Sequence, residues 1–271
     1  MSVIAKGSRS PADAAILAVM KPLVTAFIEQ WLSSPFVEVG ERGSKILGDL
    51  LDTDCDLRPQ DIPNVPASST TNNIANDVGI SDARAIATRN SRLPGQGLAW
   101  RRILQDRDIY SLILAYSSSN SQASEPPLDE KQRTLAQGRL FRILPRLAAL
   151  NLAAVMRSDF TDLHEQYSSS DAATSSGDRG TNVEGLLHYV ALHMIDREDM
   201  LMHLSLIDFF ETLVSIQAVL PYSSYRNDTL KRLVAQATAN DAQLQRALQT
   251  LPERTVPDEA EELSRFLGSV L

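Results

Sequence analysis

Cysteine is almost absent from this sequence, and its scarcity limits the chemistry open to the chain. Cys55 is the single cysteine among 271 residues, so no internal disulfide can form. A reducing compartment fits such a chain best, and we expect it in the cytoplasm. The N-terminal stretch MSVIAKGSRSPADAA contains no hydrophobic run of the kind that a signal peptide needs, so we expect no secretion.

Long apolar runs and an excess of positive charge are also missing. Every stretch of about 18 residues contains charged or polar interruptions, so we expect no membrane-spanning segment. The formal net charge of −8 argues against a general nucleic-acid binder. The hydrophobic fraction of 43% and the charged fraction of 22% are ordinary for a soluble globular protein.

Motifs that carry catalysis or hold a cofactor are absent from the sequence. The only Walker-like fragment is Gly43-Ser44-Lys45, which lacks the upstream glycine. The fragment Gly95-Gln96-Gly97 follows no strand pattern and has no third glycine. No G-x-S-x-G elbow occurs, and the acidic neighbours of Cys55 would raise a thiol pKa rather than activate the thiol. We therefore expect neither enzymatic activity nor a cofactor.

The stretch 182–220 has the strongest pattern in the chain. Two apolar runs, 183–195 and 200–220, flank the charged break Asp196-Arg197-Glu198-Asp199. Both runs have the three-to-four spacing of a helix, which predicts an antiparallel helix pair joined by a tight turn. The break supplies Asp residues that can cap the second helix, and Pro221 ends it. The apolar arc of the second helix is wide, so we expect neighbours on more than one side.

The rest of the sequence also reads as helices. We expect them at 10–33 with a split near Pro22, 34–51, 81–90, 98–105, 109–117, 129–147 with a bend at Pro145, 150–156, 159–167, 227–239, 241–251 and from 257 onward. Consecutive helix pairs predict an all-α fold, a HEAT/armadillo-like α-solenoid of stacked hairpins. One repeat domain would span 1–271, with flexible insertions at 57–79, 118–127 and 168–181. An irregular helical bundle is the alternative.

Histidines of the central pair offer one route to a metal site. Glu184 and His188 are four residues apart, as are Asp199 and His203, so each couple can share a helix face. Two acid–histidine couples on adjacent helices could hold a metal and support a helical enzyme. Neither HExxH nor the Glu-x-x-His couple of carboxylate-bridged bundles is present, so packing or capping is the favoured interpretation and we expect no metal.

Charge is distributed unevenly along the chain. Residues 84–146 carry 11 basic and 5 acidic groups, whereas 147–271 carry 9 basic and 18 acidic groups. Arg139, Arg142 and Arg146 are spaced to line one helix face, either as a solvated face balanced by nearby acids or as a ridge that meets an acidic protein. Nucleic acid is disfavoured because no aromatics alternate with these arginines. Charge placement alone gives six candidate partner-binding residues: Arg139, Arg142, Arg146, Asp196, Arg197 and Asp199.

Three stretches carry a resemblance to known proteins. The sequence from Ser33 to Arg42, continued by Ile46–Leu51, resembles a HEAT repeat. Trp100–Tyr110 and Leu187–Phe210, with HMIDREDMLMHLSLIDFF, resemble the proteasome regulatory-particle assembly chaperones, called proteasome non-ATPase regulatory subunit 5 in animals. Fungal relatives of that family are also labelled DNA mismatch repair proteins. The resemblance covers about residues 20–270, and the three polar loops are insertions.

This resemblance implies a curved helical scaffold without enzymatic activity. Such a scaffold would hold the C-terminal domain of a proteasomal ATPase subunit while the base of the regulatory particle assembles. Members of the family are longer, which implies that this chain is a shortened member. We expect a monomer that works in the cytoplasm and also in the nucleus. The alternative is a HEAT-type adaptor in another process, such as DNA repair or trafficking.

Overall fold

Helices make up nearly all of the regular structure in the computed structural model, which describes residues 2–56, 95–119, 127–167 and 185–271. Within these ranges there is no β-strand, so the predicted all-α class is confirmed. The predicted helix at 81–90 and the predicted insertions at 57–79 and 168–181 lie outside the described residues. The same holds for most of the insertion at 118–127, of which only 118–119 and 127 are described.

Four helices form the N-terminal part of the fold: α1 (Ser2–Gly7), α2 (Pro11–Val19), α3 (Lys21–Ser33) and α4 (Val37–Thr53). Ser10 caps α2 by accepting a hydrogen bond from the backbone N–H of Asp13, and Pro11 occupies the first helical position. The chain turns by 92° between α2 and α3. The predicted split near Pro22 is therefore confirmed, because the proline lies in the first turn of α3. Helix α1 was not predicted.

The middle of the chain forms α6 (Leu98–Leu104), α7 (Arg107–Ser117), α8 (Glu130–Met156) and α9 (Thr161–Tyr167). Asp106 caps α7, since its side chain accepts from the backbone N–H of Asp108. Asp129 and Gln132 form a capping box at the start of α8. Pro145 lies inside α8, where the predicted bend stays a prediction, and the helix has non-helical dihedrals at Asn151, whose φ is −153°.

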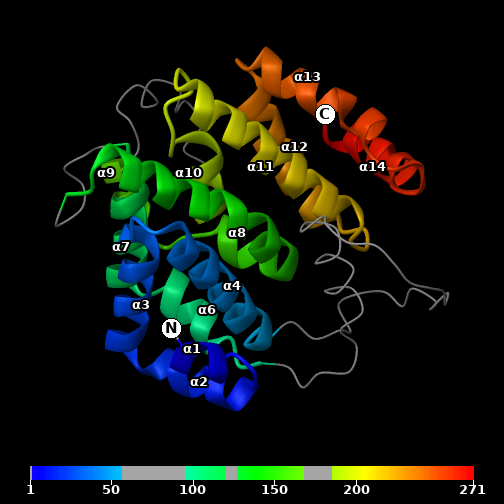
Figure 1. Cartoon of the computed structure of the whole chain (residues 1–271). Helices are drawn as coiled ribbons and strands as arrows, with labels where there is room; N and C mark the ends of the chain where they lie inside the picture. The colour runs from blue at the N-terminus through cyan, green and yellow to red at the C-terminus, as the bar shows by residue number, and fades with distance from the viewer. Residues whose placement is uncertain (1, 57–94, 120–126, 168–184) are drawn as a thin grey trace.

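Helix α8 is the element on which the two halves of the fold meet. It packs against α3, α4, α6 and α7 on the N-terminal side and against α10 and α11 on the C-terminal side. In Figure 1 its green ribbon crosses the middle of the molecule, between the blue helices and the yellow-to-red ones. Its buried apolar residues belong to one core cluster together with residues from both halves.

The C-terminal part contains α10 (Leu186–Leu192), α11 (Met200–Ala218), α12 (Ser224–Thr238), α13 (Ala242–Thr250), the 3₁₀ helix η3 (Leu251–Arg254) and α14 (Pro257–Val270). Helix α11 is covered by α8, α13 and α14, which confirms that it needs several neighbours. The prediction of an α10–α11 hairpin is wrong in its packing. Both helices make their main contacts with α8 rather than with each other, because α8 supplies a longer apolar surface.

By length and hydropathy α11 is apolar enough to cross a membrane, and α2 and α3 together meet the same test as a bent pair. No membrane-spanning segment was expected from the sequence because charged or polar residues interrupt every long apolar run, and α11 contains Asp208 and Glu211. Half of the α11 window is buried inside the protein, and a core helix of a folded domain can meet the same test.

The residues on either side of the segment 57–94 are joined by hydrogen bonds. Gly95 donates its backbone N–H to the carbonyl of Cys55 at 2.8 Å, and Gly97 donates to the carbonyl of Asp54 at 2.9 Å. The buried Asp54 carboxylate accepts from the backbone N–H of Ala99 at 2.6 Å and so satisfies the first turn of α6. Burial raises the pKa of Asp54. This contact fixes α6 at the end of α4.

Candidate protein-interaction surface

Arg139 on α8 is buried rather than presented to a partner. Its side chain is 6% exposed and reaches the C-terminal end of α3. Its guanidinium donates to the carbonyl oxygens of Trp31 at 2.7 Å, Leu32 at 2.9 Å, Ser34 at 2.7 Å and Phe36 at 3.1 Å. The last carbonyls of a helix have no partner within it, so the guanidinium acts as a cap. Burial lowers the pKa of Arg139.

Arg142 and Arg146 continue the row along α8 and face acids on α4. Arg142 pairs with Glu41 at 2.8 Å, and both side chains are more than half exposed. Arg146 pairs with Asp49 at 2.9 Å and lies 3.4 Å from the buried carboxylate of Asp52. The three arginines thus share one helix face, as their spacing predicts, and that face is turned towards α3 and α4.

Glycines on α4 make room for this row. A Cβ at Gly40 would lie 2.1 Å from Nε of Arg139, and a Cβ at Gly48 would lie 2.5 Å from Arg146. A Cβ at Gly43 would lie 2.4 Å from the ring of Trp31, whose indole N–H donates to Ser44 at 3.0 Å. The glycines of α4 therefore permit the close approach of α3 and α8.

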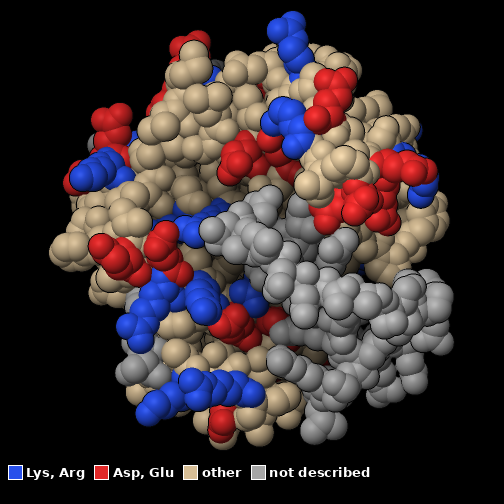
Figure 2. All heavy atoms as spheres, turned by 45° about the vertical axis from the view of Figure 1, so that its right-hand side comes forward, with Lys and Arg blue, Asp and Glu red and all other residues tan. Residues whose placement is uncertain are grey.

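The other described arginines of the basic middle segment also have internal partners. Arg101 donates to the carbonyl of Gln96, Arg102 pairs with Asp106, Arg107 pairs with Asp162, and Arg133 donates to the carbonyl of Ser119. Figure 2 shows one face of the molecule, on which basic side chains stand beside acidic ones rather than in a block of one sign. Much of the positive charge between 95 and 146 is therefore balanced within the fold.

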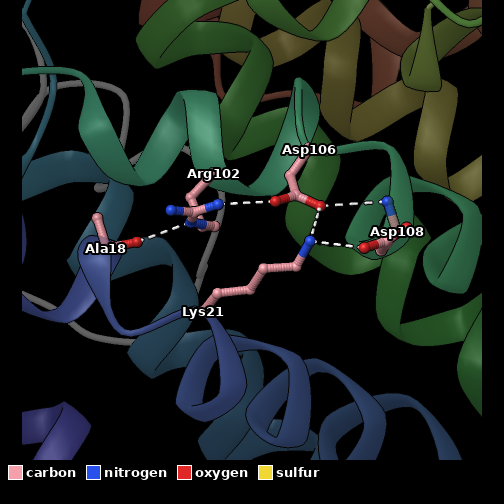
Figure 3. Close-up of polar contacts among 5 residues, drawn as sticks. All are labelled: Ala18, Lys21, Arg102, Asp106 and Asp108. Atoms are coloured by element: carbon pink, nitrogen blue, oxygen red, sulfur yellow. Dashed lines mark hydrogen bonds and ion pairs between the residues drawn. The ribbon is translucent and has the colours of Figure 1, made fainter.

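A group of charges that the sequence did not single out holds the bend between α2 and α3 against the start of α7 (Figure 3). Lys21 reaches Asp106 at 2.9 Å and Asp108 at 2.6 Å, while Arg102 bonds Asp106 at 2.7 Å and the carbonyl of Ala18 at 2.8 Å. Burial acts to raise the pKa of Asp106, but the hydrogen bonds from the two cations outweigh it and lower that pKa. Lys21 and Asp108, like Arg102 and Ala18, lie more than 80 positions apart, so no local sequence pattern predicts these contacts.

The charged break 196–199 has three predicted partner-binding residues, and each has a structural task. Asp199 caps α11 by accepting from the backbone N–H groups of Leu201 and Met202, which confirms its predicted role. Asp196 accepts from the backbone N–H of Glu198 at 2.9 Å within the turn. Arg197 donates to the carbonyl of Ala237 at 3.0 Å at the end of α12.

Asp241 at the N-terminus of α13 ties this break to the C-terminal helices. Its carboxylate lies 2.7 Å from Nε2 of His203 and 3.5 Å from Arg197, and it accepts from the backbone N–H of Leu244. Burial acts to raise the pKa of Asp241, but the N–H of Leu244 and the neighbouring His203 and Arg197 lower it. His203 therefore contacts Asp241 rather than Asp199, so the predicted Asp199–His203 couple is not formed.

Glu184, the acid of the other acid–histidine couple, lies outside the described residues. His188 approaches Gln236 on α12 at 3.1 Å, and its ring lies 5.6 Å from that of His193. Among the described residues, no three His, Cys, Asp or Glu side chains are grouped as a metal ion would require. The predicted partner-binding role of the six charged residues stays a prediction.

Large apolar side chains are exposed at the start of α11. Met200, Leu201 and Leu204 are 67%, 65% and 48% exposed, although the same helix buries Leu206 and Phe210 completely. Leu201 and Leu204 lie on the stripe that continues to Asp208 and Glu211, the polar stripe of the helix. The two leucines in that stripe are the sequence signal for this exposed area, whereas the wide apolar arc predicted neighbours on more than one side of the helix and indicated no exposed part.

Comparisons with known proteins return no relative. No protein-family model matches the sequence. No curated protein and no solved structure matches it.

Proposed function

We propose that this chain is a non-enzymatic protein-interaction scaffold with a HEAT/armadillo-like stack of helices. The finer proposal is an assembly chaperone that binds the C-terminal domain of a proteasomal ATPase subunit in the cytoplasm and the nucleus. The resemblance of Trp100–Tyr110 and Leu187–Phe210 to the regulatory-particle chaperones supports the choice of partner. These two stretches form α6, the start of α7, α10 and the first half of α11.

One observation supports a protein partner above all. The arginines with the most suggestive spacing are used inside the fold, whereas Met200, Leu201 and Leu204 leave apolar area in water at the start of α11. Exposed apolar side chains rimmed by polar ones are typical of protein-interaction sites. A helical stack also offers a long continuous surface, which suits a scaffold.

A HEAT-type adaptor in another process, such as DNA repair or trafficking, is the second candidate. The packing of helices around the central α8 supports it as much as it supports a proteasomal role, because helical scaffolds serve many partners. The identity of the partner separates the two candidates.

Affinity purification of the tagged full chain from lysate, followed by quantitative mass spectrometry, tests the proposal. The expected result is enrichment of a proteasomal ATPase subunit over a tag-only control. Arg142→Glu is the variant for the arginine row, because Arg142 is exposed and its change leaves the buried Arg139 cap intact. Enrichment of a different stable partner would favour the adaptor, and a preparation that enriches no protein would contradict both candidates.

A further inference from the structure

The start of α11 combines two surface properties, exposed apolar side chains and exposed acids. Met200, Leu201 and Leu204 leave roughly half or more of their area in water. The acidic residues immediately around them in sequence are all exposed as well: Asp196, Glu198, Asp199 and Asp208. We call these seven residues the acidic–apolar surface.

The basic side chains of this segment are directed at other helices. Arg197 is turned towards α12 and α13, where it meets the carbonyl of Ala237 and the carboxylate of Asp241. His203 is turned towards the same carboxylate at 2.7 Å. The acids of the segment are therefore exposed, whereas its basic groups are directed at α12 and α13.

Helix geometry places the apolar and acidic groups together. Leu201, Leu204 and Asp208 follow one another at spacings of three and four, so they lie on one stripe of α11. Glu198 precedes the stripe in the turn that Asp199 caps. Because Asp199 holds the first turn of α11 through two backbone N–H groups, the surface is presented on a fixed helix end rather than on a loop.

We propose that the acidic–apolar surface binds a basic amphipathic helix of a partner protein, with apolar side chains on one face and Lys or Arg beside them. The apolar face would cover Met200, Leu201 and Leu204, and the cations would meet the surrounding carboxylates. Methionine adapts its shape to different partners, and charge complementarity supplies orientation and association rate. This inference rests on the proposed function and names the region that carries it.

The size of the surface sets the expected strength. Three apolar side chains and four carboxylates give an interface well below the ~1,200 Å² of stable complexes, so this contact by itself is transient and salt-sensitive. A larger complex would use it as one contact among several.

A labelled peptide tests the proposal on the full chain. The probe is a fluorescein-labelled helix of leucine and lysine with leucines at every third and fourth position, and binding is followed by fluorescence anisotropy. Two control probes keep one property each: the same composition with leucines scattered around the helix, and the same pattern with glutamate in place of lysine. The wild-type chain is expected to bind the patterned lysine probe and to bind both controls at least about tenfold more weakly.

Variants of exposed residues separate the surface from the overall acidity of the chain. The double change Leu201→Ser with Leu204→Ser is expected to weaken binding about tenfold, and Glu198→Lys several-fold. The matched control is Ile16→Ser with Val19→Ser. These residues are 62% and 69% exposed on α2, which lies at the opposite end of the molecule in Figure 1. Within α2 the only acid is Asp13, compared with the four acids of the acidic–apolar surface.

Four results with purified protein and peptide would overturn the proposal, and two further results, with vesicles and with lysate, would do so as well. They are unchanged binding by the Leu201/Leu204 variant, equal loss in the Ile16/Val19 variant, equal binding of the glutamate probe, and wild-type self-association that the Leu201/Leu204 variant abolishes, which would identify a second copy as the occupant. Binding to neutral phosphatidylcholine vesicles that the same variant abolishes would likewise replace the peptide with a lipid surface. Recovery of the lysate partner by the Leu201/Leu204 variant at wild-type level would refute this surface while leaving the proposed function standing.

Discussion

Replacement of Arg139 by methionine removes the cap at the end of α3 while keeping a long apolar side chain. The wild-type guanidinium serves four carbonyl oxygens at 2.7 to 3.1 Å. Hydrogen bonds to charged groups contribute about 1.5–3 kcal/mol each, but the burial of the cation costs several kcal/mol and the bonds are not additive. The variant also leaves carbonyls without a partner. We expect a net loss of about 3 kcal/mol.

Urea unfolding followed by circular dichroism measures this loss in the free energy of unfolding. In thermal unfolding, the same loss corresponds to a fall in Tm of about 6–12 °C for a chain of this size. The matched variant is Arg142→Met, one turn along the same helix, whose exposed pair with Glu41 is expected to contribute less than about 1 kcal/mol. Equal stability losses in the two variants, or a loss below about 1 kcal/mol for Arg139→Met, would refute the assignment of Arg139 as a cap.

The remaining predictions concern stability as well. Gly43→Ala should destabilise the fold because the added Cβ would meet the buried ring of Trp31. Gly138→Ala should stabilise the fold by about 0.5–1 kcal/mol, because no atom lies within 4 Å of the added Cβ. Thermal unfolding compares the two variants. Asp106→Asn should lower the free energy of unfolding at pH 7. Because the pKa of Asp106 is depressed in the folded state, the difference in stability between variant and wild type should shrink as the pH falls from about 5 to 3. Urea titrations at several pH values measure this difference. Asp54→Ala should cost about 1–3 kcal/mol by leaving a buried N–H of α6 unpaired, and hydrogen exchange should rise first in α6.

Local signals predicted helix ends well. The caps at Ser10, Asp106, Asp129, Asp199 and Asp241 are all present, because a cap depends on side chains within three residues of it. Of these, Asp199 belongs to the charged break from which a cap was predicted, and the other four lie at or close to predicted helix starts. The start of α12 was placed at Asn227, and it lies at Ser224 with Ser223 as the cap. Ser223 and Asn227 are both good caps, and the sequence alone does not choose between them.

Contacts between distant segments were the part that sequence could not supply. The spacing of Arg139, Arg142 and Arg146 correctly placed them on one face of α8, but it could not say that α4 covers that face. The acids that pair with Arg142 and Arg146 lie about 100 positions away in the chain. The same limit explains why α10 and α11 were expected to pair with each other, since adjacency in sequence does not reveal that α8 lies against both.

The central claim is that this helical chain works by binding a protein, and that the start of α11 takes part. Calorimetric titration of the wild-type chain with the purified C-terminal domain of each proteasomal ATPase subunit tests it most directly, with the Leu201→Ser, Leu204→Ser variant alongside. The account predicts saturable binding of one such domain and weaker binding by the variant. The absence of heat with every domain would contradict the proposed partner, and identical titrations of wild type and variant would contradict the role of α11.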